Sequence, residues 1–228
     1  MKTLTKYLNE KLVIIFPSQV DEKLVIFPSQ VDEKLVIFPS QVDEKLVINK
    51  YYKNAYTCAP KTFNELRKII EDRYNNLGPG TKDMPIDFND IDVSNIVSFY
   101  GKYKGGIFAG TKFKYIDVSD WDVSNAEYMH YMFGGCNQLK FVGDLSNWNV
   151  SNVKSMSCMF YKCEQLKSVG DLSNWDVSKV EDMTSMFENC KQLKSVGDLS
   201  NWNVSNVKRI DFMFYCSGIT NIPDWYLV

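Results

Sequence analysis

The chain has 228 residues, of which 45% are hydrophobic and 14% aromatic, which is enough apolar material to bury a core and too much for a disordered chain. Its 26 basic and 28 acidic side chains give a formal net charge of -2, without the basic excess that is typical of nucleic-acid binders. Neither DNA nor RNA is therefore expected as a partner.

The N-terminus lacks the pattern of an export or membrane signal. Its first continuously apolar run, residues 12–16, is shorter than a signal-peptide core and far shorter than a transmembrane helix. No cysteine stands where a lipoprotein anchor would need one. We therefore expect no signal peptide, lipobox or membrane insertion, which favours a cytoplasmic or virion-associated location over classical secretion.

Residues 1–60 form a tandem-repeat arm with a period of 11 or 12 residues. The motif E-K-L-V-I begins at Glu10, Glu22, Glu33 and Glu44. Each L-V-I-F run could be a short strand ending at the proline that follows it. Two alternatives stay open: the runs form a small meander or edge strands, or the arm is extended and partly disordered.

A capping helix is predicted over residues 61–80. Thr62 and Glu65 form a capping box, and Gly78 with Pro79 ends the helix. Apolar residues at helical spacing give it one buried stripe: Phe63, Leu66, Ile69, Ile70 and Leu77. We expect this helix to cover the first unit of the region that follows.

Residues 81–228 contain a second repeat, of 27 residues. Tryptophan recurs at this interval at Trp121, Trp148, Trp175 and Trp202. A Met-Phe pair recurs at the same interval, from Met132-Phe133 to Met213-Phe214. A fixed period with apolar residues at fixed offsets indicates one structural unit per repeat, with each unit burying its neighbour's apolar face. Shortened units at residues 91–95 and 219–225 would close the array.

Each unit is expected to hold a strand, a polar loop and a short helix. The L-K-S-V-G segment, residues 166–170, alternates as a short strand does and ends in glycine, whereas M-x-x-M-F-x-x-C spaces its apolar residues like one helical turn. The predicted fold class is therefore an α/β repeat, a short solenoid with an N-terminal capping helix and the tandem-repeat arm.

Polar residues recur within the repeat as well. A ladder of asparagines is predicted to bridge successive units, formed by Asn125, Asn152 and Asn206 with Asn147, Asn174 and Asn201 beside the tryptophans. The Asp column at 144, 171 and 198 could share calcium, but lysines four residues before each Asp favour a solvated face laced with salt bridges. The cysteines at 136, 163 and 190 are expected to be reduced and buried.

No catalytic, cofactor or metal site is predicted. His130 is the only histidine, and its equivalents in later units are Ser157, Thr184 and Asp211, as at a solvent-facing position. The sequence has no G-x-S-x-G nucleophile elbow, no C-x-x-C pair and no G-K-[ST] phosphate loop. We therefore expect a protein that is not an enzyme.

With its W-D-V-S-N-V and M-x-x-M-F-x-x-C signatures, the 27-residue unit resembles the BspA-type leucine-rich repeat of bacterial surface proteins. The resemblance covers residues 86–228. It implies a leucine-rich-repeat-like solenoid over residues 81–228 and an adhesion or interaction protein without a catalytic centre. The leader M-K-T-L-T-K-Y-L-N-E-K-L also resembles the start of proteins of gut bacteria and their phages.

The expected function is a protein-binding or adhesion-type scaffold that presents a surface to a macromolecular partner. The alternative is a structural or accessory component of a phage particle or mobile element, attached through the N-terminal arm. Positions that vary among otherwise similar units are the candidates for partner binding, because tyrosine in particular is frequent at interfaces. They are Tyr128, His130, Tyr131, Asn137, Phe141, Tyr161, Lys162 and Glu164.

Overall fold

The structure is a computed structural model, and it describes residues 14–15, 36–37, 58–102 and 105–227. The chain divides into two units, Met1–Lys53 and Asn54–Val228. In the first unit, strand β1 (Ile14–Ile15) pairs in parallel with β2 (Val36–Ile37). These strands lie in the first and third L-V-I runs. The remaining runs of the predicted arm lie outside the described residues.

The helix of the second unit is confirmed as α2 (Phe63–Leu77). The Thr62 hydroxyl accepts a hydrogen bond from the Glu65 N–H at 3.2 Å, which is the first half of the predicted capping box. The Glu65 carboxylate accepts from the N–H of Lys61 at 2.8 Å. Gly78 adopts a φ of +73° at the C-terminal end, a conformation that glycine reaches without steric cost.

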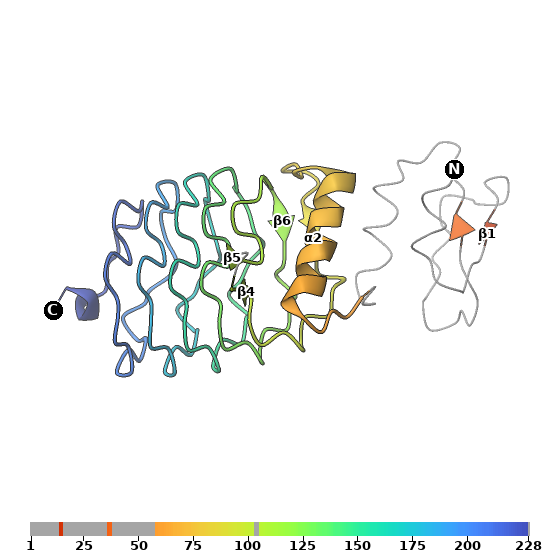
Figure 1. Cartoon of the computed structure of the whole chain (residues 1–228). Helices are drawn as coiled ribbons and strands as arrows, with labels where there is room; N and C mark the ends of the chain where they lie inside the picture. The colour runs from red at the N-terminus through yellow and green to blue at the C-terminus, as the bar shows by residue number, and fades with distance from the viewer. Residues whose placement is uncertain (1–13, 16–35, 38–57, 103–104, 228) are drawn as a thin grey trace. The chain divides into compact units, whose positions relative to one another are not determined.

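The strands of the second unit are all two residues long. β3 (Ile86–Asp87) pairs in parallel with β6 (Ile116–Asp117), and β4 (Tyr100–Gly101) pairs antiparallel with β5 (Gly105–Gly106). A 3₁₀ turn, η4 (Asp224–Tyr226), lies near the C-terminus. Most of the remaining described residues are turns and irregular coil (Figure 1).

The predicted α/β leucine-rich-repeat solenoid is therefore wrong. Residues 166–170, the expected strand, are irregular, and Gly170 has a φ of +88°. The M-x-x-M-F-x-x-C segments, expected to be helical, are chains of tight turns. In the described residues the α-helix is α2, outside the 27-residue repeat, and the strands form two-stranded sheets.

The backbone conformation explains why no helix forms. One residue in each M-x-x-M-F segment has a φ between +55° and +59°, at Tyr131, Cys158, Ser185 and Phe212. A single left-handed residue interrupts the i to i-4 hydrogen-bond pattern, so a right-handed helix cannot continue through it. The backbone then forms its hydrogen bonds with neighbouring segments instead of within itself.

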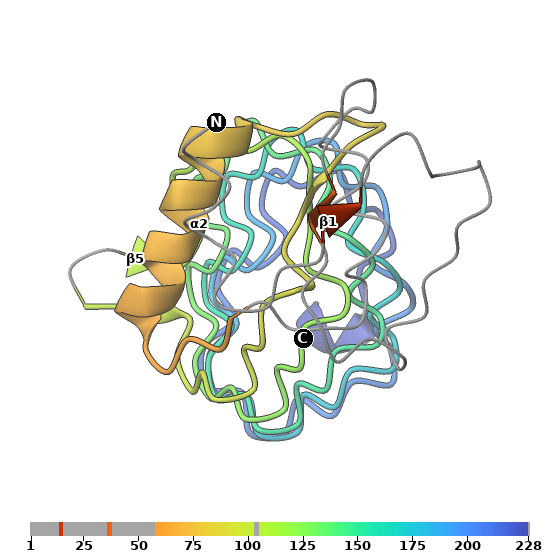
Figure 2. The same cartoon turned by 90° about the vertical axis from the view of Figure 1, so that its right-hand side faces the viewer.

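Successive 27-residue segments lie against one another, and we call residues 121–147, 148–174, 175–201 and 202–227 layers. Isolated parallel bridges run across them through Tyr128, Ser155, Asp182 and Arg209. Viewed at right angles to Figure 1, the layers trace nearly the same path (Figure 2). Each layer therefore finds its backbone partners in the layers next to it.

The core consists of side chains stacked at the repeat interval. Trp175 stacks between Trp148 and Trp202, with ring centroids 6.5 Å away on each side, and its indole N–H donates to the Leu145 carbonyl at 2.9 Å. A parallel stack of phenylalanines runs through Phe108, Phe133, Phe160, Phe187 and Phe214. The expectation that these apolar positions point inward is confirmed.

The polar columns are mostly structural. The predicted Asn ladder is confirmed for Asn125, Asn152 and Asn206, whose amide N–H groups donate to Ser carbonyls of a neighbouring segment at 2.9, 2.8 and 2.7 Å. The predicted Lys pairing of the Asp column is not what forms. Instead, these carboxylates accept the N–H of the serine two residues on, at 146, 173 and 200.

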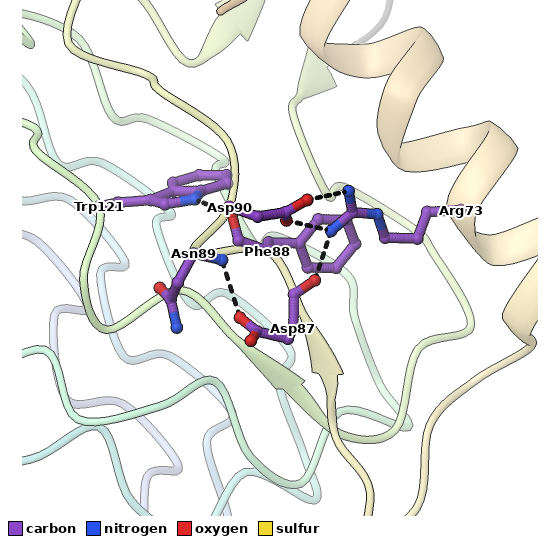
Figure 3. Close-up of polar contacts among 6 residues, drawn as sticks. All are labelled: Arg73, Asp87, Phe88, Asn89, Asp90 and Trp121. Atoms are coloured by element: carbon purple, nitrogen blue, oxygen red, sulfur yellow. Dashed lines mark hydrogen bonds and ion pairs between the residues drawn. The ribbon is translucent and has the colours of Figure 1, made fainter. Parts of the chain in front are cut away.

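Helix α2 is fixed to the first segments by two arginines. The Arg73 guanidinium makes a bidentate ion pair with Asp90 at 2.6 and 3.0 Å, donates to the Asp87 carbonyl, and lies 5.0 Å from the Phe88 ring (Figure 3). The same figure shows Trp121 donating to the Phe88 carbonyl at 2.8 Å. Helix α2 and Trp121 therefore both bind residues 87–90, the helix through Arg73 and Trp121 through its indole N–H.

Arg67 caps the backbone of the first segment. Its guanidinium donates to the carbonyls of Gly106 and Ile107 at 3.1 and 2.8 Å. Gly101 allows the helix to approach, because a Cβ there would lie 2.5 Å from the Phe63 ring. Arg67 thus gives the Ile107 carbonyl a charged donor and adds a second donor to the Gly106 carbonyl, which also accepts the N–H of Ala109 at 3.0 Å.

Candidate functional site

The predicted binding residues contribute to a surface patch of aromatic rings. The Tyr128 and His130 ring centroids are 6.2 Å apart, as are those of Tyr131 and Tyr161. Tyr128 and Tyr131 are 38% and 39% exposed, although both are large aromatic side chains. Tyr100 of β4 packs 3.9 Å from the His130 ring. We call Tyr100, Tyr128, His130, Tyr131 and Tyr161 the aromatic patch.

The patch is held in place by polar contacts beneath it. A hydrogen bond with the Cys158 side chain is the main cause that raises the pKa of Tyr131 to about 12, with burial second. The Lys162 ammonium lies 5.0 Å from the centre of the Tyr161 ring, in cation–π range. At neutral pH the Tyr131 phenol therefore stays protonated, and one lysine lies beside the Tyr161 ring.

His130 sits at the base of the patch, which corrects its placement as a solvent-facing residue. Its Nδ1 atom is buried and has no hydrogen-bond partner among the described residues. Burial lowers the pKa of His130, and the charge of Asp182 works against that shift. The ring is thus held neutral between Tyr100 and Tyr128, and it supports the surface tyrosines.

Three of the predicted binding residues have partners of their own. Glu164 pairs with Lys191 at 3.2 Å. The Phe141 carbonyl accepts the N–H of Ile116 at 3.0 Å, which extends the β6 segment. Asn137 is exposed, and its N–H bonds to the carbonyl of Gly135 at 2.9 Å.

Two groups of surface residues were missed from the sequence. Tyr100 could have been found by extending the alignment of the segment at residues 91–95 five residues further, because the bridge from Ser98 to Tyr128 sets Tyr100 opposite His130. The second group is a column of alternating charge, in which each acid pairs with a lysine 27 residues on. It contains Glu127, Lys154, Glu181 and Lys208, and we call it the charge column.

The cysteines in the core lack the properties of nucleophiles. Cys136, Cys163 and Cys190 are free and buried, as predicted, and each thiol donates to a phenylalanine carbonyl at 2.9 to 3.1 Å. Burial raises the pKa of Cys136 to about 11 and that of Cys190 to about 12. These side chains therefore remain thiols at neutral pH.

The described part of the chain carries neither a metal cluster nor a membrane-spanning helix. No group of three or more His, Cys, Asp or Glu side chains there could hold a metal ion. Among the same residues, no helix has the length and apolar content needed to cross a membrane.

The fold and the patch thus define a coil-rich protein of stacked layers with a helical cap and a surface group of aromatic rings. Residues 102–225 match the family described as "Mycoplasma protein of unknown function, DUF285", and because the match spans more than half of the chain, the chain belongs to this family. No curated protein and no solved structure matches the chain. The comparisons do not bear on the resemblance to BspA-type repeats.

Proposed function

We propose that this chain is a non-enzymatic binding protein that presents the aromatic patch to a protein partner. The observation that carries the proposal is the exposure of Tyr128 and Tyr131, which leaves more than a third of each side chain in solvent beside Tyr161. Tyrosine offers a large contact area at a small entropic cost, and it is enriched among residues that dominate binding energy. The net charge of -2 favours a protein over a nucleic acid.

The chemistry of the candidate nucleophiles supports a non-enzymatic role. His130 is enclosed on its Nδ1 side, and the raised pKa values of Cys136 and Cys190 keep these side chains in the poorly nucleophilic thiol form. A broad hydrolase substrate screen, with His130→Ala as control, tests this part. An activity present in the parent and lost in the variant would contradict it.

Binding is tested by affinity capture from the native source, using the full chain and a variant with Tyr128, Tyr131 and Tyr161 all changed to alanine. We expect the variant to lose at least about tenfold in affinity for the captured protein, since interface tyrosines each contribute on the order of 1 kcal/mol or more. Unchanged urea unfolding would show that the variant is folded.

The matched control changes two exposed apolar side chains outside the aromatic patch, Leu77→Ala with Val97→Ala. This control should bind like the parent. If the triple variant bound like the parent as well, the aromatic patch would not be the binding surface.

A further inference from the structure

The last layer ends in a row of unpaired backbone donors. In the layer before it, the N–H groups of Met183, Ser185, Phe187 and Asn189 donate to carbonyls of the last layer at 2.8 to 2.9 Å. The equivalent N–H groups of the last layer have no acceptor among the described residues. We call these four groups the open edge: the N–H groups of Ile210, Phe212, Phe214 and Cys216.

The donors of the open edge all belong to peptide units oriented in the same direction. Within this row the carbonyls, such as those of Arg209 and Asp211, accept from the preceding layer and the inner N–H groups donate to the following one, so partial positive charge faces outward along the row at the last layer. The row repeats every second residue. It therefore matches an extended or turn-rich segment that offers four carbonyls at the same spacing.

Two large aromatic side chains beside the open edge are exposed, next to the exposed carboxylate of Asp211. Phe212 and Tyr215 are 59% and 57% exposed, and their ring centroids are 5.8 Å apart. Val207 is half-buried in the last layer, whereas its equivalent Val153 is fully buried because another layer covers it. The last layer is thus covered only in part among the described residues: Trp225 stacks on Trp202 and Tyr226 packs against Phe214, whereas Phe212 and Tyr215 remain exposed.

The charge column indicates which charge an incoming segment should carry. Glu127 pairs with Lys154 at 2.9 Å, and Glu181 pairs with Lys208 at 2.7 Å, so acid and base alternate along the array. Beside it, Arg209 pairs with Asp182 at 2.9 Å. The column ends on Lys208 next to Arg209, and a segment placed on this edge would continue the alternation with acidic residues.

We propose that the open edge is a docking site for an extended acidic and apolar segment of a partner protein, whose backbone carbonyls accept the four N–H groups. A second copy fits less well. Two open edges face to face would oppose donor to donor, and the carbonyls at the other end of the array, at Gly106 and Ile107, are already occupied by Arg67. The site lies apart from the aromatic patch and does not depend on it.

The chain itself supplies a probe peptide. Residues 181–190 already offer the carbonyls of Asp182, Thr184, Met186 and Glu188 to an equivalent donor row, at 2.8 to 3.0 Å. The probe is this decapeptide with serine in place of its cysteine, E-D-M-T-S-M-F-E-N-S, carrying a fluorophore. Its matched control has the three acidic residues replaced by Lys, Arg and Lys.

The experiment measures amide hydrogen exchange of the full chain with and without the probe peptide. In the free chain, the four open-edge amides should exchange at least about 100-fold faster than those of Met183, Ser185, Phe187 and Asn189. Saturating probe peptide should slow them at least about tenfold, and the charge-reversed peptide should bind at least about tenfold more weakly.

A variant adds a second test at the same edge. Phe212→Asp with Tyr215→Asp keeps the fold because both side chains are exposed, and Asp tolerates the φ of +59° at position 212. It should bind the probe at least about tenfold more weakly, since it removes apolar contact and repels the acidic peptide. Val97→Asp, at another exposed apolar side chain, should bind normally.

Four results would each overturn the proposal. The first two are open-edge amides that already exchange as slowly as the inner ones in the free chain, and no binding of the probe at up to millimolar concentration. The other two are probe binding that leaves the exchange of these amides unchanged, and exchange that slows with the concentration of the chain alone as dimers form. The last result would assign the edge to a second copy. The triple tyrosine variant should bind the probe normally, so the two proposals fail separately.

Discussion

The two ends of the stacked layers are finished in opposite ways. At the N-terminal end, helix α2 buries Leu66 and Ile70 completely, and Arg67 donates to the carbonyls of Gly106 and Ile107. At the C-terminal end, Trp225 covers Trp202 and donates to the Leu199 carbonyl at 2.8 Å. Tyr226 packs against Phe214 with the ring centroids 5.1 Å apart, and the four backbone donors of the open edge have no acceptor among the described residues.

The difference follows from the polarity of the hydrogen bonds between layers. In the M-x-x-M-F segments, the N–H groups of every second residue donate to the following layer, so this row must end in donors at the last layer and in carbonyls at the first. A guanidinium suits the carbonyl side, because it brings several N–H donors and a positive charge. The donor side needs acceptors, and the described residues supply none for the open edge.

The largest effect is expected for a tryptophan with neighbours on both sides. Trp175→Ala should destabilise the chain by about 3 to 5 kcal/mol, since the ring is 3% exposed between two others and loses both stacking and burial. Trp225→Ala, with a stacked tryptophan on one side, should cost about 1 to 2 kcal/mol. Urea unfolding measures both, and equal losses would show that the C-terminal end is packed as tightly as the middle.

The second effect concerns the cap of the carbonyl end. Arg67→Met should cost about 2 kcal/mol, because it keeps the aliphatic stem and leaves two carbonyls without their charged donor. Lys68→Met, at an exposed neighbour on the same helix, should change stability by less than about 0.5 kcal/mol. If the two variants unfolded at the same urea concentration, the guanidinium would not be acting as a cap.

Much of the packing could be predicted from sequence, because it depends on the period. Thr62 and Glu65 placed the helix, the 27-residue interval placed the buried tryptophans, and the Asn ladder followed from side-chain chemistry. The backbone path could not be predicted in the same way. The spacing of M-x-x-M-F-x-x-C matches a helical turn, and Tyr131 and Cys158 carry no sequence signal for a positive φ, since glycine is the residue that normally marks it.

The candidate site was also predicted only in part, because the repeat period places some of its residues and not others. Tyr128, Tyr131 and Tyr161 were identified because they vary between units, and their exposure follows from the register. His130 was read as solvent-facing from its polar equivalents, but Tyr100 of the irregular first segment covers it. The open edge involves backbone groups alone, and no side-chain pattern in the sequence marks it.

A smaller effect on stability is expected at a left-handed backbone position that is occupied by glycine in the first layer and by cysteine in the last. Gly135 has a φ of +75°, and Cys216, at the same position of the last layer, has a φ of +53°. Gly135→Ala should cost about 1 to 2 kcal/mol, since a Cβ is disfavoured in this conformation. Cys216→Gly should range from no change to a gain of about 1 kcal/mol, because relief of strain is offset by the entropy of glycine in the unfolded chain.

Urea unfolding of the two variants against the parent measures this contrast. Cys216 is exposed, so its replacement removes no buried surface that would confuse the comparison. A loss of stability in Cys216→Gly as large as that in Gly135→Ala would show that the last layer uses the cysteine side chain as part of its packing.

The smallest effect is a pH dependence of stability, which arises from a position where the two ends of the array carry different residues. His130, near the N-terminal end, is enclosed, and burial lowers its pKa below the ordinary value of 6.5, whereas its equivalent in the last layer, Asp211, is exposed. In the window just below pH 6.5, the unfolded chain therefore binds more protons than the folded chain. Stability that is fully present above pH 6.5 should fall as the pH drops through the folded pKa of His130.

His130→Gln isolates this contribution, because glutamine keeps a polar side chain that does not titrate. The parent should lose stability relative to this variant between pH 7.5 and pH values below 6.5, as followed by urea unfolding at each pH. Asp87, whose pKa is raised mainly by burial, also titrates in acid, but it does so in both proteins and cancels from their difference. Since His130 is the one histidine of the chain, the midpoint of its imidazole signal in NMR gives the folded pKa directly. A midpoint at or above 6.5 would mean that the ring is solvated and that Tyr100 does not close over it.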